Sequence, residues 1–379
     1  MTQKLATILA QAGNRYDLKT GAISVPIYQT ASFGHPALGQ TTGFDYSRSS
    51  NPTRLVLEET MAKVDGGHKG FAFASGLAAI DAVLRLFQRG DRIVVTEDLY
   101  GGTFRLFEKV FRPFGIEAVY VDTSDLPAVR NALSLSGVKA VFVESPTNPL
   151  LKIADIRAIA KAARASGVLT VVDNTFLTPV FQRPLEQGAD MVVYSATKYL
   201  AGHNDVVAGI VVTGTPELSE RIGFYQNAIG GILGPQDSWL TLRGLKTLPL
   251  RVKKQQENAC AIAEWLAAQP RVRRVYFPGL PNHPGRQILD REGSGYGGMI
   301  SFEVEDSSRI PALLAGVKIF TFAESLGGVE SLITYPAVQT HADMDASLRE
   351  KFGINDRLLR LSIGIEEVGE LIDDLKELL

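Results

Sequence analysis

Short apolar runs alternate with amphipathic stretches from about residue 49 to residue 244. Each run is nearly continuous in apolar residues, which is typical of strands buried on both faces of a parallel sheet. The stretches between the runs have helical spacing, as in Asp155–Ala165, where Asp155 stands at the capping position. This alternation predicts an α/β fold, with a mostly parallel sheet covered by helices. The predicted strands are residues 71–74, 92–96, 117–121, 140–144, 169–172, 191–194 and 207–212.

The pattern changes on both sides of this region. Residues 246–268 predict one long helix, and the shorter strands after it have an antiparallel pattern, so a smaller α+β domain is expected at 245–379. The first 48 residues show little core-forming periodicity, but their many aromatic residues argue against disorder. We therefore predict an N-terminal arm at 1–48 that contacts a neighbouring subunit, an α/β domain at 49–244 and an α+β domain at 245–379.

Composition narrows the class of protein. The chain has 379 residues, of which 45% are apolar, so two domains with sizeable cores are expected. A net charge of −2 gives no reason to expect a nucleic acid or an anionic membrane as partner. The sequence contains no run of about 18 apolar residues, so no membrane span is predicted. The five histidines lack metal-ligand spacing, so no metal site is predicted.

The chain has a single cysteine, Cys260. This rules out a disulfide framework and fits a reducing compartment, so we expect a cytoplasmic protein. The helical pattern around Cys260 favours a small buried apolar side chain over a nucleophile.

Polar residues follow several predicted strands at the end where α/β folds bind ligands. Ser195-Ala196-Thr197-Lys198 follows the strand at 191–194, and Asp173 follows the strand at 169–172. A lysine beside hydroxyl groups that can hold a phosphate suggests the Schiff-base lysine of a pyridoxal phosphate enzyme. These four residues alone fit a strand end with a solvated lysine better. Asp173 changes the balance, because a buried acid needs a charged partner and a protonated pyridine nitrogen is one.

Two further regions hold polar residues in informative places. At Ser75-Gly76-Leu77 a strand turns into a helix, and such a junction aims backbone N–H groups at one point, as a phosphate requires. That helix is predicted to continue to Phe87, with Gly90 ending it. Arg360 stands inside the apolar run 358–363. It fits either an edge strand that leaves the arginine in solvent or a partly buried clamp for a carboxylate.

Two motifs suggest other functions and lack the context that those functions need. Residues 293–298 have the glycine spacing of a dinucleotide site, but a strand-like run follows them instead of a helix. Ser195 and Lys198 also match the nucleophile motif of penicillin-recognising serine amidohydrolases, and Lys19-Thr20-Gly21 matches their third motif. In that class the third motif follows the serine, whereas here it precedes it.

Taken together, these segments resemble the trans-sulfuration (Cys/Met metabolism) family of pyridoxal phosphate enzymes, and within it the bacterial cystathionine lyases. The resemblance runs nearly from end to end and implies fold type I, the fold of aspartate aminotransferase. It is carried by residues 46–53 (Tyr-Ser-Arg-x-x-Asn-Pro-Thr), 75–77, 99–103 (Leu-Tyr-Gly-Gly-Thr), 144–149 (Glu-Ser-Pro-Thr-Asn-Pro), 172–175, 195–199, 323–328 and 360–364.

The resemblance implies a role for each matching residue. Lys198 would bond the cofactor, pyridoxal 5′-phosphate, and shuttle protons, while Asp173 would pair with its pyridine nitrogen. Tyr100 would stack on the ring and, deprotonated or nearly so, assist proton transfers. The phosphate would be held by Gly76, Leu77, Ser195 and Thr197, with Tyr46 and Arg48 from the neighbouring subunit. The resemblance further implies a homotetramer built from two dimers, in which the active site is shared across each dimer.

For the substrate, a small sulfur amino acid, Arg360 would grip the α-carboxylate, with Ser325 and Asn148 assisting. Glu324 would meet the distal amino group of cystathionine or of incoming cysteine; a solvated loop acid is the alternative. Methionine γ-lyases usually carry a cysteine where this chain has Gly102. We therefore expect a cystathionine γ-lyase, with cystathionine γ-synthase second and a β-lyase or methionine γ-lyase after it.

Overall fold

The computed structural model describes residues 3–340 and 346–379. Contacts between Cα atoms divide the chain into two compact units, each made of two segments. The first unit comprises Met1–Leu86 with Asp190–Pro249, and the second comprises Phe87–Ala189 with Leu250–Leu379. The boundaries predicted after residues 48 and 244 follow the secondary-structure pattern and stay a prediction.

The first unit contains three strands in the order β1-β7-β6, with β7 antiparallel to both neighbours. Their bounds are β1 Lys69–Phe73, β6 Met191–Ser195 and β7 Gly209–Thr213. Gly209 is the register partner of Phe73 in β1 and of Ser195 in β6. The carboxyl ends of β1 and β6 therefore meet at one edge, and the chain segments that follow them begin there.

The helices of the first unit begin at recognisable caps. The side chain of Asn51 accepts the N–H of Thr53 at the start of α2, and Ser75 accepts the N–H of Ala78 in α3. Helix α3 ends at Leu84, about one turn before the predicted end, and the Asp91 carboxylate then accepts the N–H of Gln88 and turns the chain. The helices are α1 Leu5–Ala10, α2 Pro52–Asp65, α3 Gly76–Leu84, α8 Pro216–Ile229 and α9 Pro235–Leu245.

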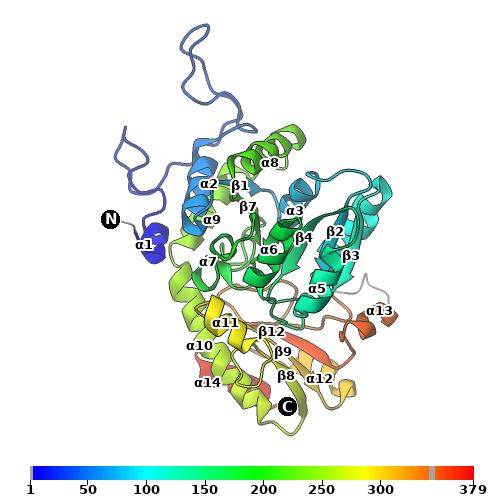
Figure 1. Ribbon diagram of the computed structural model, residues 1–379. Helices are drawn as coiled ribbons and strands as arrows, with labels where there is room; N and C mark the ends of the chain where they lie inside the picture. The colour runs from blue at the N-terminus through cyan, green and yellow to red at the C-terminus, as the bar shows by residue number, and fades with distance from the viewer. Residues whose placement is uncertain (1–2, 341–345) are drawn as a thin grey trace. The chain divides into compact units, whose positions relative to one another are not determined.

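Residues 11–50 of the first unit contain no helix and no strand. Figure 1 draws them in blue as long loops that extend away from α2. Large apolar side chains in this segment are exposed, among them Leu18 at 89% and Leu38 at 104%. Such exposure in ordered chain is unfavourable in a single copy, which is consistent with the predicted arm.

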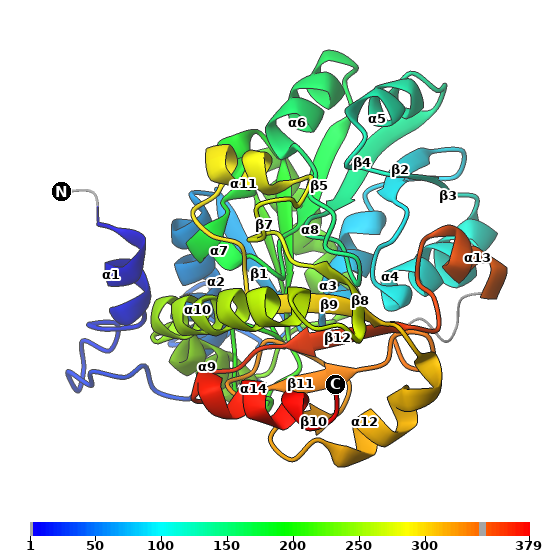
Figure 2. The same cartoon turned by 90° about the horizontal axis from the view of Figure 1, so that it is seen from below.

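The second unit contains four parallel strands in the order β5-β4-β2-β3. Their bounds are β2 Arg92–Thr96, β3 Glu117–Val121, β4 Val138–Glu144 and β5 Leu169–Asp173. Glu144 and Asp173 are register partners at the carboxyl ends of β4 and β5. Helices α5 and α6 lie side by side, as Figure 2 shows. The helices of this region are α4 Gly101–Arg105, α5 Leu126–Leu133, α6 Ile156–Ala165 and α7 Thr178–Phe181, with a π-helix at Leu106–Phe111.

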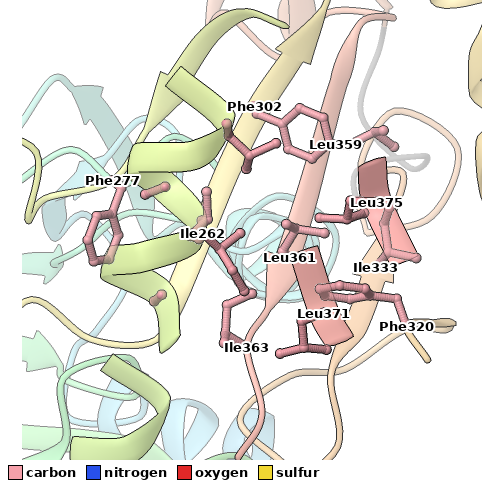
Figure 3. Close-up of a cluster of buried hydrophobic side chains, with 14 of the residues drawn as sticks. Ile262, Phe277, Phe302, Phe320, Ile333, Leu359, Leu361, Ile363, Leu371 and Leu375 are labelled. Carbon is pink, nitrogen blue, oxygen red and sulfur yellow. The ribbon is translucent and has the colours of Figure 1, made fainter. Parts of the chain in front are cut away.

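A second, smaller sheet of five strands completes this unit, in the order β10-β11-β12-β9-β8. Its strands are β8 Val272–Tyr276, β9 Met299–Val304, β10 Thr321–Phe322, β11 Leu332–Thr334 and β12 Leu358–Ser362. Side chains from α10, α12 and α14 pack on one face of the sheet in a continuous apolar core, part of which Figure 3 shows. The helices are α10 Leu248–Ala267, which begins in the first unit, α11 Arg286–Glu292, α12 Ile310–Gly316, α13 Ala346–Lys351 and α14 Val368–Lys376.

Strand β12 shows why an arginine can stand in an apolar run. Side chains alternate between the two faces of a strand, and Leu359 and Leu361 point into the helical core. Arg360 therefore points to the opposite face. Because β12 lies between β11 and β9, it is not an edge strand, and Arg360 is 1% exposed. The solvent-exposed alternative for Arg360 is wrong.

The predicted α/β class with mostly parallel strands and a second smaller sheet is confirmed. The seven strands predicted for residues 71–212 are present, with ends within two residues of those expected. Strand β7 is antiparallel to its neighbours β1 and β6. None of the helices in the described part of the chain is long and apolar enough to cross a membrane.

Candidate active site

The first unit brings the two predicted phosphate-binding segments into contact. A Cβ atom built on Gly76, the first residue of α3, would lie 2.9 Å from the Cβ of Ser195. The backbone of α3 can approach Ser195 this closely because residue 76 has no side chain. The first N–H groups of a helix are available to a ligand, so an anion held here would meet both backbone N–H groups and hydroxyls.

Lys198 lies one turn beyond Ser195, on a backbone held at both ends. Its N–H donates to the Ser195 carbonyl at 3.1 Å, and its carbonyl accepts from Gly202 N–H at 2.8 Å. Thr197 is tied to Ala208 in both directions, since its Oγ1 accepts the Ala208 N–H at 3.0 Å and donates to the Ala208 carbonyl at 3.2 Å. The lysine and the hydroxyls of Ser195 and Thr197 therefore belong to one rigid turn.

Tyr46 and Arg48 of the same unit are exposed on the arm. The Arg48 guanidinium lies 5.6 Å from the centre of the Tyr46 ring, and its Nη1 donates to the Asn227 carbonyl at 2.8 Å. Tyr46 is 46% exposed. The two side chains are adjacent to each other, and their exposure fits the predicted role toward a neighbouring subunit.

In the second unit, Asp173 ends β5 with its carboxylate oriented by Thr175. Both the N–H and the hydroxyl of Thr175 donate to Oδ1 of Asp173, at 3.0 Å and 2.6 Å. All the hydrogen bonds that Asp173 accepts from described residues end on Oδ1, which leaves Oδ2 for a donor from a ligand. Burial raises the pKa of Asp173, and the Thr175 hydrogen bonds oppose that shift. A cationic donor at Oδ2 would stabilise the charged form.

Tyr100 begins α4 on the same side of the unit. Its backbone N–H donates to Oε2 of Glu144 at 3.1 Å. A Cβ on Gly102 would lie 2.9 Å from Cζ of the Tyr100 ring, so the glycine gives the ring its space. Burial raises the pKa of Tyr100; Arg105 and Arg360 lower it, and Glu324 and Glu144 raise it. This direction favours the protonated phenol in the chain itself, in contrast to the nearly deprotonated form that the resemblance implied.

Arg360 meets two of its predicted companions. Its Nη1 donates to Oδ1 of Asn148 at 2.8 Å, and its Nη2 donates to the Ser325 carbonyl at 3.0 Å and to Thr334 Oγ1 at 3.3 Å. These three acceptors are neutral oxygens that fix the plane of the guanidinium. Ser325 has a left-handed backbone with φ of 85°, a conformation that is costly for serine. Glu324, the residue before it, is exposed.

The predicted residues thus form two groups, each organised within its own unit. The first group contains the phosphate-binding residues and Lys198, and the second contains Asp173, Tyr100 and the residues around Arg360. Glu144 and Thr334 belong to the second group, and sequence reasoning assigned neither a role. The sequence did contain a signal for Glu144. It follows the apolar run 140–143 directly, and burying an acid there costs free energy unless it has a function or a partner.

The other candidate residues have structural roles. Cys260 packs at the margin of the core of the second sheet, and burial raises the pKa of its thiol, which disfavours a nucleophile. Residues 293–298 connect α11 to β9 and open no helix. Among the described residues, no group of three or more His, Cys, Asp or Glu side chains could hold a metal ion; His341 lies outside them.

Comparison with known proteins identifies the family. A family model described as "Cys/Met metabolism PLP-dependent enzyme" matches residues 6–379. The chain is 50% identical over 376 residues to cystathionine gamma-lyase of Bacillus subtilis (strain 168), with 99% of both chains covered. It is 52% identical over 375 residues to cystathionine beta-lyase of Lactococcus lactis subsp. cremoris (strain MG1363), covering 99% of this chain and 98% of that one.

A solved structure gives the same result. Cystathionine gamma synthase from Xanthomonas oryzae pv. oryzae, in complex with aminoacrylate and cysteine, matches with a TM-score of 0.97 and 45% identity, over 100% of this chain and 98% of that chain. The three relatives carry the names of three different reactions, so these similarities define the group of enzymes and leave the reaction open. The chain belongs to the Cys/Met metabolism family of pyridoxal phosphate-dependent enzymes, in the cystathionine lyase and synthase group.

Proposed function

We propose that the protein is a cystathionine γ-lyase, which converts L-cystathionine and water into cysteine, 2-oxobutanoate and ammonia. The observation that supports a reaction of cystathionine is the position of Glu324, which favours the γ-lyase and the γ-synthase and does not separate them. It precedes Ser325, whose carbonyl accepts from Arg360, and its charge acts on Tyr100. A carboxylate next to Ser325 whose charge acts on Tyr100 is suited to the distal ammonium group of cystathionine while Arg360 holds the α-carboxylate.

Two observations rank the alternatives. Cystathionine γ-synthase, which joins cysteine to an O-acyl or O-succinyl homoserine, would use Glu324 for the amino group of incoming cysteine and is the second candidate. Methionine γ-lyase activity is disfavoured, because this chain has Gly102 where those enzymes usually carry a cysteine. A β-lyase stays a third candidate. Family membership leaves the serine amidohydrolase alternative without support.

Pyridoxal 5′-phosphate is the cofactor of this family, and the chain carries groups that fit it. The close contact between Gly76 and Ser195 forms a cradle for a phosphate at the start of α3. Oδ2 of Asp173 can accept a hydrogen bond from a protonated pyridine nitrogen. We propose that Lys198, Ser195, Thr197, Gly76 and Leu77 hold the aldehyde and phosphate groups, and that Asp173 and Tyr100 hold the ring.

When bound, pyridoxal phosphate supplies an electron sink for bond breaking at Cα. Arg360 orients the substrate through its α-carboxylate, with Asn148 and Ser325 fixing the guanidinium. Lys198 accepts the proton from Cα. After Lys198 has released the first proton and accepted a second one from Cβ, Tyr100 as a neutral phenol donates a proton to the departing thiolate of cysteine. Asp173 stays ionised throughout and keeps the pyridine nitrogen protonated.

We also propose that the N-terminal arm predicted at residues 1–48 contacts a second copy of the chain, and that Tyr46 and Arg48 of one copy bind the phosphate of the other. The exposed apolar side chains of the arm support this proposal. A homotetramer made of two such dimers is the expected assembly. Two active sites per dimer would then each need residues from both chains.

Replacing Gly76 with alanine is expected to weaken pyridoxal phosphate binding by about 10- to 100-fold, because the new methyl group would force α3 away from Ser195. The measurement is a titration of apoprotein with the cofactor, followed by visible absorption. Gly369→Ala in α14 is the matched control, since a Cβ there meets nothing within 4 Å. An affinity within twofold of wild type would contradict the phosphate cradle.

Replacing Glu324 with alanine is expected to raise KM for L-cystathionine by about 2- to 5-fold, the size of an exposed ion pair. Substrates that lack a distal amino group, such as L-homocysteine, should be unaffected. Steady-state kinetics on both substrates makes the comparison, with Glu305→Ala as a control for an exposed acid elsewhere in the unit. An equal loss on both substrates would remove the proposed role of Glu324.

Product analysis on L-cystathionine tests the reaction itself. Release of 2-oxobutanoate with cysteine supports the γ-lyase. Pyruvate with homocysteine would identify a β-lyase. If neither pair forms, and cystathionine accumulates from O-succinylhomoserine and cysteine, the protein is a γ-synthase.

A further inference from the structure

Glu144 is a buried acid that has no assigned role in the reaction. It ends β4 and pairs in register with Asp173, which ends the adjacent parallel strand β5. Residues paired in this way present their side chains on the same face of the sheet. The two carboxyl groups therefore share one edge of the second unit, where Tyr100 also lies.

Only one of the two carboxyl oxygens of Glu144 has a hydrogen-bond partner among the described residues. Oε2 accepts the backbone N–H of Tyr100 at 3.1 Å. Oε1 is buried and has no hydrogen-bond partner among the described residues. A carboxylate normally satisfies both oxygens when it is buried, so a full negative charge on Glu144 would be poorly stabilised.

The charges that face Glu144 have the same sign as a carboxylate. They are those of Asp173 and Asp98. Lys152 lies 3.9 Å from Asp98 and is closer to Glu97 and Asp122, at 3.1 Å and 2.9 Å, so its charge is shared among those three acids. Asp98 also accepts from Thr147 at 2.6 Å. Glu144 forms no ion pair with any described residue. Tyr100 in turn faces Arg105, Arg360 and Glu324, so the cations on this side act on the tyrosine.

These surroundings favour the protonated form of Glu144. Burial raises its pKa well above the usual range, and the charge of Asp173 raises it further, while the N–H groups of Tyr100 and Asn148 oppose the shift. Two carboxyl groups that share a dry site cannot both ionise easily. Of the two, Asp173 has two hydrogen bonds from Thr175 to its charged form, one of them from a hydroxyl group. Glu144 interacts only with the backbone N–H groups of Tyr100 and Asn148, and its Oε1 has no hydrogen-bond partner among the described residues.

We propose that Glu144 is a positioning residue that carries a proton at neutral pH. As a neutral acid it holds the backbone of Tyr100 in place and leaves Asp173 as the single anion of the pair. The protonated pyridine nitrogen of the cofactor can then pair with the ionised carboxylate of Asp173, because no second negative charge beside Asp173 disfavours its ionisation. This inference concerns the cofactor alone, so it holds whichever reaction of the family the enzyme catalyses.

The Glu144→Gln holoenzyme tests the proposal directly, because glutamine copies a protonated glutamate in shape and still accepts from Tyr100. The infrared difference spectrum between wild type and E144Q at pH 7 should show the loss of a carbonyl band of a protonated carboxylic acid. Glu303→Gln is the matched control, since Glu303 is a buried acid of the same unit with Arg273 at 3.9 Å. That difference spectrum should show the loss of carboxylate bands instead.

The pH dependence of the visible spectrum of bound pyridoxal phosphate gives a second reading. In E144Q the midpoint of this pH dependence should differ from that of wild type by less than about half a pH unit, because the substitution removes no charge. Glu144→Ala should keep that midpoint and weaken cofactor binding by about 10-fold, since the Tyr100 N–H loses its acceptor.

Two results would overturn the proposal. One is the loss of carboxylate bands in E144Q in place of an acid band. The other is a midpoint shift of about one unit or more, which the removal of a full charge beside Asp173 would produce. If E144Q does not fold, Glu144→Asp gives the same reading, because a shortened side chain displaces an acid band under the proposal and a carboxylate band otherwise.

Discussion

Lys198→Ala protein is expected to stay colourless with pyridoxal phosphate and to lose turnover by about 10⁴-fold or more. The lysine amine has two proposed tasks, bonding the cofactor aldehyde and accepting the Cα proton, and no other amine belongs to the rigid turn that Ser195 and Gly202 hold. Visible absorption of the purified protein measures the first task. Assay of 2-oxobutanoate and pyruvate release measures the second.

The control for this experiment is Lys161→Ala, an exposed lysine of α6. This variant should be as yellow and as active as wild type. Circular dichroism of Lys198→Ala should match wild type, because the turn is held by backbone hydrogen bonds that alanine keeps. A yellow and active Lys198→Ala enzyme would end the assignment of this residue.

Arg360→Lys is expected to raise KM for L-cystathionine by about 10²-fold. Lysine keeps the positive charge but loses the planar fork that binds a carboxylate through two parallel hydrogen bonds. It also loses the bonds that hold the guanidinium against Asn148 and the Ser325 carbonyl. Steady-state kinetics measures the change, and thermal unfolding separates a binding defect from a loss of stability.

An analogue without the α-carboxylate provides the control for this role. The affinity of this analogue for wild type should be low, and its affinity for Arg360→Lys should be nearly the same. The matched variant is Arg274→Lys, an exposed arginine on β8 of the same sheet, which should keep the wild-type KM. If Arg360→Lys weakens the analogue as much as L-cystathionine, Arg360 is a structural residue of β12.

Local pattern predicted most of the secondary structure. The seven strands of the α/β region and the long helix α10 follow from runs of apolar residues and from helical spacing, and both signals are contained in short windows. Predictions of where elements end were weaker. Helix α3 ends at Leu84, and beyond it the Asp91 side chain accepts the backbone N–H of Gln88; such a side-chain contact has no periodic signal in the sequence.

In the candidate site, too, some features could be predicted from local sequence and others could not. Lys198 and Asp173 could be proposed because polar residues at the ends of apolar strands are conspicuous in a sequence, and Gly76 could be proposed because it stands where a strand turns into a helix. The burial of Arg360 could not be decided, since an apolar run does not say whether its strand lies at the edge of a sheet or inside it. Strand order decided this, by placing β11 and β9 on either side of β12.

By itself, then, the sequence determined the α/β class and the family, and it predicted the residues that would carry the chemistry, because all of these depend on residue type and spacing along the chain. Tertiary structure alone decided which of these residues touch. The shared partner Gly209 brings Ser195 next to Gly76, and strand register puts Glu144 beside Asp173. Register and strand order join positions far apart in the chain, so the charge state of a buried pair such as Glu144 and Asp173 follows from the fold and cannot be inferred from either residue alone.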